Sequence, residues 1–127
     1  LFRLLLPKPD AALLSNRQAF NLFEPSYVGA MRAGGAALYE DGLPYTQPWP
    51  FRVEEITVPV RMWHGTQDAN FHIAQARILA ARLPTVQFFE RNEGHYSLPF
   101  NWAEEMLADL ARQMTEIQVA AINPSNV

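Results

Sequence analysis

The sequence has 127 residues, of which 49% are hydrophobic and 18% are charged, as in one folded domain or part of one rather than in a disordered chain. The net charge is -3 and the ten Lys and Arg residues are scattered, so we expect no nucleic acid partner and no attachment to an anionic membrane. Cysteine is absent, which excludes disulfides, thiolate metal sites and a cysteine nucleophile.

Helices are expected in the first part of the chain. Residues 1–6 suit the end of either a strand or a helix, which the prolines that follow terminate. After Pro9, the mixture of polar and apolar residues over 10–20 predicts a helix that starts at Pro9 or Asp10. We expect Pro25 to restart the chain, because proline lacks the backbone donor of a helix interior.

A second helix is expected between residues 26 and 42. Apolar positions recur there on one helical face, at Tyr27, Ala30, Met31, Gly34 and Leu38. The adjacent glycines 34–35 cost about 1 kcal/mol each relative to alanine, which predicts a break or a close helix contact. Residues 43–50 contain three prolines and are expected to form an extended connector that ends this part of the chain.

A strand, a helix and a second strand are expected after a short turn at residues 53–56. Residues 58–63 and 86–89 are apolar without alternation, as in strands covered on both faces. The helix between them runs from about His72 to Leu83, before Pro84. Its predicted inward positions are Ile73, Ala76, Leu79, Ala80 and Leu83.

The last predicted element is a long helix that begins at Asn101. Asn101 is followed three residues later by Glu104, which resembles a capping box. Its predicted core face consists of Trp102, Met106, Leu110, Met114, Ile117 and Ala121. The polar residues 123–127 are expected to form a tail.

Two polar residues follow the two predicted strands, Asp68 after the first and His95 after the second. Strands joined by a helical crossover lie side by side, with their carboxyl ends at one edge of the sheet. We therefore expect Asp68 and His95 to meet there. A carboxylate bound to one ring nitrogen fixes the tautomer of a histidine, and imidazole titrates near neutral pH, so the pair suits an acid and a general base.

The run VPVRMWHGTQD, a helix ending in ARLP, a strand and then EGHYSL closely resemble the C-terminal part of α/β-hydrolase-fold enzymes. The resemblance is strong over residues 49–110. It implies an α/β fold in which a helical cap and connector span residues 1–50, the C-terminal part of the hydrolase core with two parallel strands and flanking helices spans 51–121, and a tail spans 122–127. It also implies that Asp68 is the acid and His95 the base, without a cofactor.

The cap in such enzymes often covers the active site, so the resemblance makes aromatic residues of the first 50 positions candidate walls of a pocket for a small-molecule substrate. The candidates are Phe23, Tyr27, Tyr39 and Trp49. The alternative is that these rings simply pack the helices, since buried aromatic side chains mostly serve cores.

The same part of the chain offers three alternative interpretations. His64, Asp68 and His72 are spaced by four, as metal ligands on a helix would be, but a strand and Gly65 interrupt that spacing. Glu93 is an alternative acid, although it stands too near His95 in the chain to orient the ring easily. Ser97 is a possible nucleophile, but nothing nearby supplies an oxyanion hole.

A glycine-flanked nucleophile elbow is missing from the sequence. We therefore expect the chain to be part of a longer cytoplasmic hydrolase that cleaves an ester, amide, epoxide or carbon–halogen bond, with its nucleophile upstream and with no activity in this chain alone. Apolar strands without neighbours predict self-association through an exposed edge. The alternative is a non-catalytic binding or assembly module of the same fold.

Overall fold

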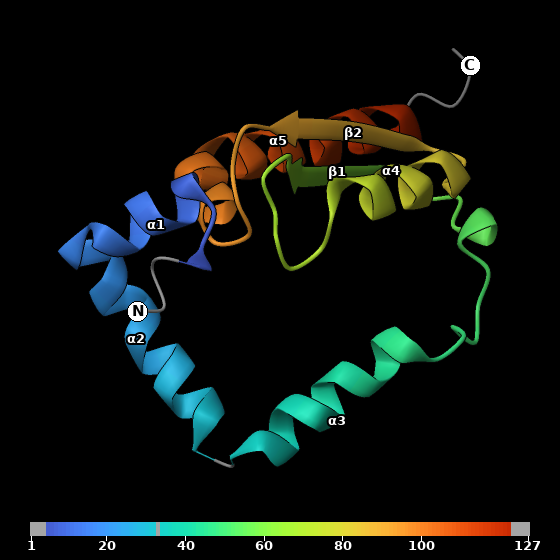
Figure 1. Ribbon diagram of the computed structural model, residues 1–127. Helices are drawn as coiled ribbons and strands as arrows, with labels where there is room; N and C mark the ends of the chain where they lie inside the picture. The colour runs from blue at the N-terminus through green and yellow to red at the C-terminus, as the bar shows by residue number, and fades with distance from the viewer. Residues whose placement is uncertain (1–4, 33, 123–127) are drawn as a thin grey trace.

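The computed structural model describes residues 5–32 and 34–122, which form a mixed α/β structure (Figure 1). The described elements, in chain order, are α1 (Lys8–Ser15), α2 (Arg17–Met31), α3 (Gly35–Thr46), the short 3-10 helix η2 (Val53–Glu55), β1 (Val60–Gly65), α4 (Ile73–Arg82), β2 (Val86–Arg91) and α5 (Ser97–Ile122). No helix within the described ranges is long and apolar enough to cross a membrane. The expectations for residues 1–4 and 123–127 lie outside the described residues.

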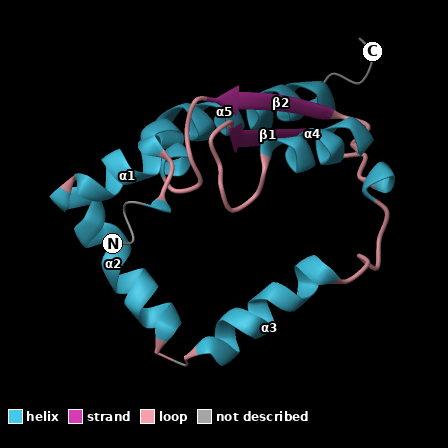
Figure 2. Cartoon of the chain, viewed as in Figure 1, coloured by secondary structure: helices cyan, strands magenta, loops and turns pink. Residues whose placement is uncertain are grey.

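The two strands pair in parallel and form the sheet expected from the sequence. Val60 lies opposite Val86, and the register continues to Gly65 opposite Arg91. Helix α4 makes the crossover between them, so the loops that follow β1 and β2 leave from the same end of the sheet (Figure 2). This arrangement brings two loops that are distant in sequence to one place.

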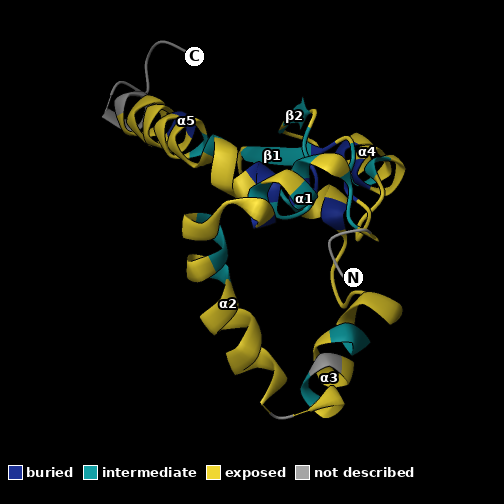
Figure 3. Ribbon diagram, turned by 60° about the vertical axis from the view of Figure 1, so that its left-hand side comes forward, coloured by how far each residue is buried: buried dark blue, intermediate teal, exposed yellow. Residues whose placement is uncertain are grey.

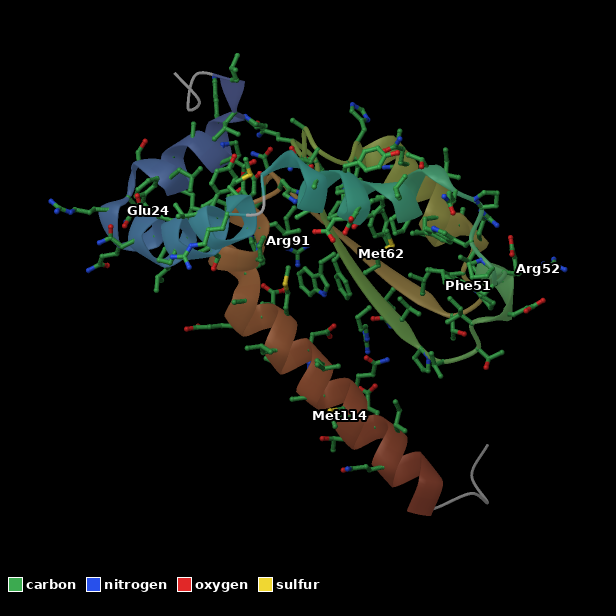
Figure 4. The ribbon with its side chains drawn as sticks, turned by 90° about the horizontal axis from the view of Figure 1, so that it is seen from below. Glu24, Phe51, Arg52, Met62, Arg91 and Met114 are labelled. Atoms are coloured by element: carbon green, nitrogen blue, oxygen red, sulfur yellow. The ribbon has the colours of Figure 1, made fainter. Side chains whose placement is uncertain are left out.

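The packing around the sheet combines apolar and polar contacts. Strand β1 lies between α4 and α5 (Figure 3). Ala76 and Ala80 of α4 are buried, as predicted for its inward face, and the rings of Trp63 and Phe89 stack with centroids 4.3 Å apart. The guanidinium of Arg91 lies 4.7 Å from the ring centroid of Trp63, and it also lies near the start of α5 (Figure 4). These contacts fix the ends of both strands.

Helix α5 departs from the sequence expectation at its start. It begins at Ser97 rather than at Asn101, and Pro99 occupies its first turn, where a missing backbone N–H costs no intrahelical bond. Asn101 does not cap the helix. Its side-chain amide instead donates to the Glu93 carboxylate at 3.1 and 3.2 Å.

The predicted core face of α5 is also wrong beyond Met106. Leu110, Met114 and Ile117 are 48%, 55% and 49% exposed, whereas Asp109 and Gln113 are buried. The reason is that polar side chains of α5 pair with groups at the start of β1. Asp109 lies 3.6 Å from the Arg61 guanidinium, and the Gln113 side chain donates to the Pro59 carbonyl at 2.9 Å. The side chain of Ala121 lies outside the described residues.

The helix expected over residues 10–20 is divided in two at Asn16. The Asn16 side chain accepts hydrogen bonds from the backbone N–H groups of Gln18 and Ala19 at 2.9 and 3.2 Å, which makes it the N-cap of α2. Pro25 then lies inside α2 instead of restarting the chain. A proline removes one backbone bond from a helix, and the remaining turns of this 15-residue helix accommodate that loss.

The break predicted at the adjacent glycines is present, since Gly34 has a φ of 68° before α3 begins. That backbone conformation favours glycine. The connector expected to start at residue 43 is shorter than predicted, because α3 continues to Thr46 with Pro44 inside it. Helix α2 leads away from the sheet and α3 runs back toward it, and most of the described residues of both helices are exposed (Figure 3). Near the end of α3, the Tyr45 ring contacts the Phe71 ring with centroids 5.4 Å apart.

Candidate functional site

The loops that follow the two strands are tied together by backbone hydrogen bonds. Thr66 N–H donates to the Arg91 carbonyl at 2.8 Å, and Gln67 N–H donates to the Glu93 carbonyl at 2.9 Å. A glycine is required where the loops cross, because a Cβ added to Gly65 would collide with the Glu93 carbonyl. These bonds fix the position of one loop relative to the other, so the side chains that the two loops carry also have a fixed relative position.

Asp68 is fixed by its own turn. Its Oδ1 accepts hydrogen bonds from the backbone N–H groups of Asn70 at 2.8 Å and Phe71 at 2.9 Å, and its side chain is only 6% exposed. Short Asp side chains commonly close turns in this way. The second carboxylate oxygen, Oδ2, remains directed to the loop after β2.

The predicted meeting of Asp68 and His95 is confirmed. Asp68 Oδ2 lies 3.0 Å from His95 Nδ1. A carboxylate accepts hydrogen bonds, so Nδ1 of the ring carries the proton and donates it. In neutral His95 the other nitrogen, Nε2, is then an unprotonated acceptor, and it has no hydrogen-bond partner among the described residues. With 34% of its side chain exposed, His95 can accept a proton from a group outside the pair.

The electrostatics of Asp68 favour its charged form. Burial of the carboxyl raises its pKa, but the hydrogen bonds from Phe71, His95 and Asn70 outweigh burial and lower the pKa below its ordinary value. Asp68 is therefore a carboxylate at neutral pH. A buried negative charge against Nδ1 stabilises the imidazolium that forms when Nε2 takes a proton.

The other two histidines have structural contacts. His64 Nε2 donates to the Phe71 carbonyl at 2.7 Å and lies 3.8 Å from Asp68 Oδ2, so it helps to hold the Asp68 turn. The His72 side chain accepts from Ala74 N–H and caps α4. Within the described residues, no group of three or more potential ligands is close enough to hold a metal ion.

Glu93 and Ser97, the alternative acid and nucleophile, are engaged elsewhere. Burial raises the pKa of Glu93, whereas hydrogen bonds from three neighbouring polar side chains lower it by more. Two of these bonds come from Asn101 and from the Trp102 indole, the latter at 3.2 Å, and no contact between described residues joins the Glu93 carboxylate to the His95 ring. Ser97 is fully buried, and its hydroxyl accepts from Gly94 N–H at 2.8 Å. A substrate cannot reach it there.

Aromatic rings flank His95. The Tyr96 ring stands edge-on to the imidazole with centroids 5.1 Å apart, and the Phe71 ring lies on another side at 5.7 Å. Neither residue was predicted from the sequence to lie at the site. Both could have been found by position, since Tyr96 follows the histidine directly and Phe71 follows Asp68 by three residues.

The predicted pocket walls divide into two groups. Phe23 makes an edge contact with Tyr96 at 5.0 Å and stacks with Tyr27 at 6.0 Å, so these two rings reach the surroundings of His95. Tyr39 is 69% exposed, and Trp49 stacks on Phe51 at 5.5 Å. No contact between described residues connects either ring to His95, and their role in substrate binding stays a prediction.

A recess of about 370 Å³ adjoins Phe23 on α1 and α2. The residues that line it are Leu14, Phe20, Phe23, Glu24, Tyr27 and Val28. All but Glu24 present carbon-rich side chains to it. Phe23, which lines the recess, contacts the Tyr96 ring, and Tyr96 in turn contacts the imidazole.

The role of Asp10 was not predicted from the sequence, where this residue marks only the expected start of a helix. Asp10 is 1% exposed, and its carboxylate accepts hydrogen bonds from three consecutive backbone N–H groups, those of His95, Tyr96 and Ser97. Partners 85 to 87 residues apart leave no local signal in a sequence.

No protein-family model matches this sequence, and no curated protein or solved structure matches it either.

Proposed function

We propose that the chain supplies the acid and the base of an α/β-hydrolase-type enzyme whose nucleophile lies upstream of residue 1. The observation that supports this proposal is the 3.0 Å hydrogen bond from His95 Nδ1 to the Asp68 carboxylate, formed at the carboxyl ends of two parallel strands. The resemblance of residues 49–110 to the C-terminal part of that superfamily also supports it.

In this proposal His95 Nε2 acts as the base. With a hydroxyl nucleophile, Nε2 takes its proton as the oxygen attacks the substrate carbonyl, and Asp68 stabilises the imidazolium. His95 then returns the proton to the leaving group. With a carboxylate nucleophile, Nε2 instead activates the water that hydrolyses the ester intermediate. The bond cleaved is an ester, amide, epoxide or carbon–halogen bond accordingly.

The substrate is a small molecule with an apolar part. Phe71 and Tyr96 flank the imidazole, and Phe23 extends the apolar surface into the recess on α1 and α2. Cavities of this size with mostly apolar walls are typical of small-molecule sites.

A non-catalytic assembly module is the second candidate function. The observation that favours it is the apolar stripe on α5, formed by Leu107, Leu110, Met114 and Ile117, which are 48% to 66% exposed. An unpartnered apolar face of this kind is suited to association with another chain.

The test is an assay of activated esters, aminoacyl amides, epoxides and haloalkanes with the longer natural protein and with the 127-residue chain. The longer protein should hydrolyse at least one class, and His95→Ala should abolish most of that activity. His72→Ala is the matched control, because it removes an imidazole that only caps α4. The 127-residue chain should be inactive. Activity that survives His95→Ala would rule out the proposed base.

A further inference from the structure

The carboxylate of Asp10 joins the first turn of α1 to the loop that carries His95. Its Oδ2 accepts from His95 N–H at 3.0 Å, and its Oδ1 accepts from Tyr96 N–H at 3.0 Å and from Ser97 N–H at 2.8 Å. Two of these donors lie directly before α5 and the third begins it. All three groups would otherwise lack an intrahelical partner.

The fit around this carboxylate is close. A Cβ added to Gly94 would overlap the Asp10 carboxylate itself, so a side chain at position 94 would displace it. Negative charge is also favoured at the N-terminus of a helix, where the backbone N–H groups converge. Asp10 therefore performs two tasks. It caps α5, and it holds the backbone of His95.

We propose that Asp10 is a positioning residue for His95, whose catalytic consequence rests on the function proposed above. The imidazole needs two constraints to present Nε2 in one place. Asp68 holds the ring through Nδ1, and Asp10 holds the backbone through the His95 N–H. Each constraint comes from a different part of the chain, Asp68 from the loop after β1 and Asp10 from α1.

The same helical region touches the histidine loop a second time. Phe23 of α2 packs against the Tyr96 ring at 5.0 Å, while Asp10 binds the Tyr96 backbone. Phe23 and Leu14 also line the apolar recess. The segment that would contact the substrate therefore also sets the position of the base, so a shift of α1 would change the alignment of Nε2.

Asp10→Asn tests this proposal because asparagine has the shape of aspartate but separates the capping of α5 from the bond to the His95 backbone. With its carbonyl oxygen in the place of Oδ1, the amide keeps the bonds from Tyr96 and Ser97. Its NH2 group then takes the place of Oδ2 and faces the His95 N–H. Both groups are donors, so the hydrogen bond from the His95 N–H is lost. The helix cap is retained and the His95 backbone is released. Asp41→Asn, at an exposed position on α3, is the control with the same change in charge.

The first readout needs no activity. In the wild-type protein, the His95, Tyr96 and Ser97 amides should exchange slowly with solvent, and the His95 Nδ1 proton should give a low-field NMR resonance. Asp10→Asn should speed exchange at His95 more than at Ser97 and should broaden or shift that resonance, well below the melting temperature. A purely structural role would lower the melting temperature and leave the resonance of the folded protein unchanged.

The second readout is turnover by the longer protein. A displacement of about 1 Å can cost on the order of 100-fold in rate, so kcat should fall by about 10-fold to 100-fold with little change in KM. Asp41→Asn should match wild type. Unprotected amides in the wild type would overturn the inference even if Asp10→Asn fails to fold, as would an unchanged His95 resonance in a folded variant. If the longer protein hydrolyses none of the substrates, the proposed function fails, while the NMR result still decides whether Asp10 positions His95.

Discussion

The α/β unit, residues 53–122, and the helical segment, residues 8–46, hold their side chains in different ways. In the α/β unit, two paired strands and the helices beside them fix both loops of the site, and Asp68 is almost fully buried. In the helical segment, α2 has no buried residue and leads away from the sheet, and α3 runs back toward it (Figures 1 and 3). Its firm attachment is at α1, where Asp10 and Leu14 are buried.

The comparison indicates that the two regions serve the site in different ways. Asp68 and His95, the proposed acid and base, stand on loops whose backbone positions are set by strand pairing, which favours precise geometry. The aromatic residues of the helical segment lie on exposed helices that few contacts restrain, which favours adaptation to a substrate. Changes in the α/β unit should therefore affect turnover and stability strongly, and changes in the helical segment should affect substrate affinity more.

The largest difference is expected in the catalysis proposed for a longer protein that contains this chain. Asp68→Asn should lower kcat by about 10,000-fold, because an amide no longer holds the Nδ1 tautomer of His95. Phe23→Ala, in the helical segment, should raise KM by about tenfold and leave kcat near wild type, as loss of binding common to ground and transition states does. Steady-state kinetics checks both. Glu93→Gln is the control, and a loss as large as that of Asp68→Asn would identify Glu93 as the acid instead.

Stability should separate the two regions next. Gly65→Ala places a Cβ against the backbone of Glu93 and Gly94, which cannot move without breaking the paired loops, so it should lower the free energy of unfolding by about 1–3 kcal/mol. Gly42→Ala in α3 meets nothing within 4 Å and should raise it by about 0.5–1 kcal/mol. Urea denaturation measures both. Equal changes in the free energy of unfolding for the two variants would contradict the prediction and would show that the loops adjust to a Cβ as freely as the exposed helix does.

The pH dependence of stability should report on Asp68. Its folded pKa is lower than its unfolded value, so its stabilising contribution is complete above an unfolded pKa of about 3.9 and is lost as pH falls through the folded pKa. The difference in unfolding free energy between wild type and Asp68→Asn should therefore shrink as pH falls below about 4. Denaturation curves from pH 6 downward check this. Exposed Asp41→Asn should show no such change, and a constant difference for Asp68→Asn would contradict the prediction.

The smallest effect on folding is expected at the apolar stripe of α5. Leu110→Gln with Met114→Gln should change the free energy of unfolding by only about 0.5 kcal/mol, because both side chains are half exposed, with Met114 on the part of α5 distant from α1 (Figure 4). Gln113→Ala on the buried face should cost about 1 kcal/mol by removing the bond to the Pro59 carbonyl. Sedimentation should show less self-association of the stripe variant, and unchanged association would exclude the stripe as the contact surface.

The sequence by itself determined the strand, helix and strand around the site and the approach of Asp68 to His95. Apolar runs bounded by glycine and proline specify those elements locally, and a helical crossover between parallel strands leaves little freedom in where their carboxyl ends lie. The contact at 3.0 Å follows from that topology. The turn at Asp68 is equally local, since both of its backbone donors lie within three residues.

Only the tertiary structure decided where α5 begins, which face it buries and what holds the His95 backbone. A capping box at Asn101 is a local signal, and the carboxylate of Asp10 from a distant helix overrides it by satisfying the N–H groups from His95 to Ser97. The helical spacing of Leu110, Met114 and Ile117 predicted that they are buried. Instead, Arg61 and the Pro59 carbonyl pair with Asp109 and Gln113, and the three apolar side chains are exposed. A sequence pattern records which side chains can be buried or can cap a helix, whereas the partner that does so is fixed only when distant segments come together.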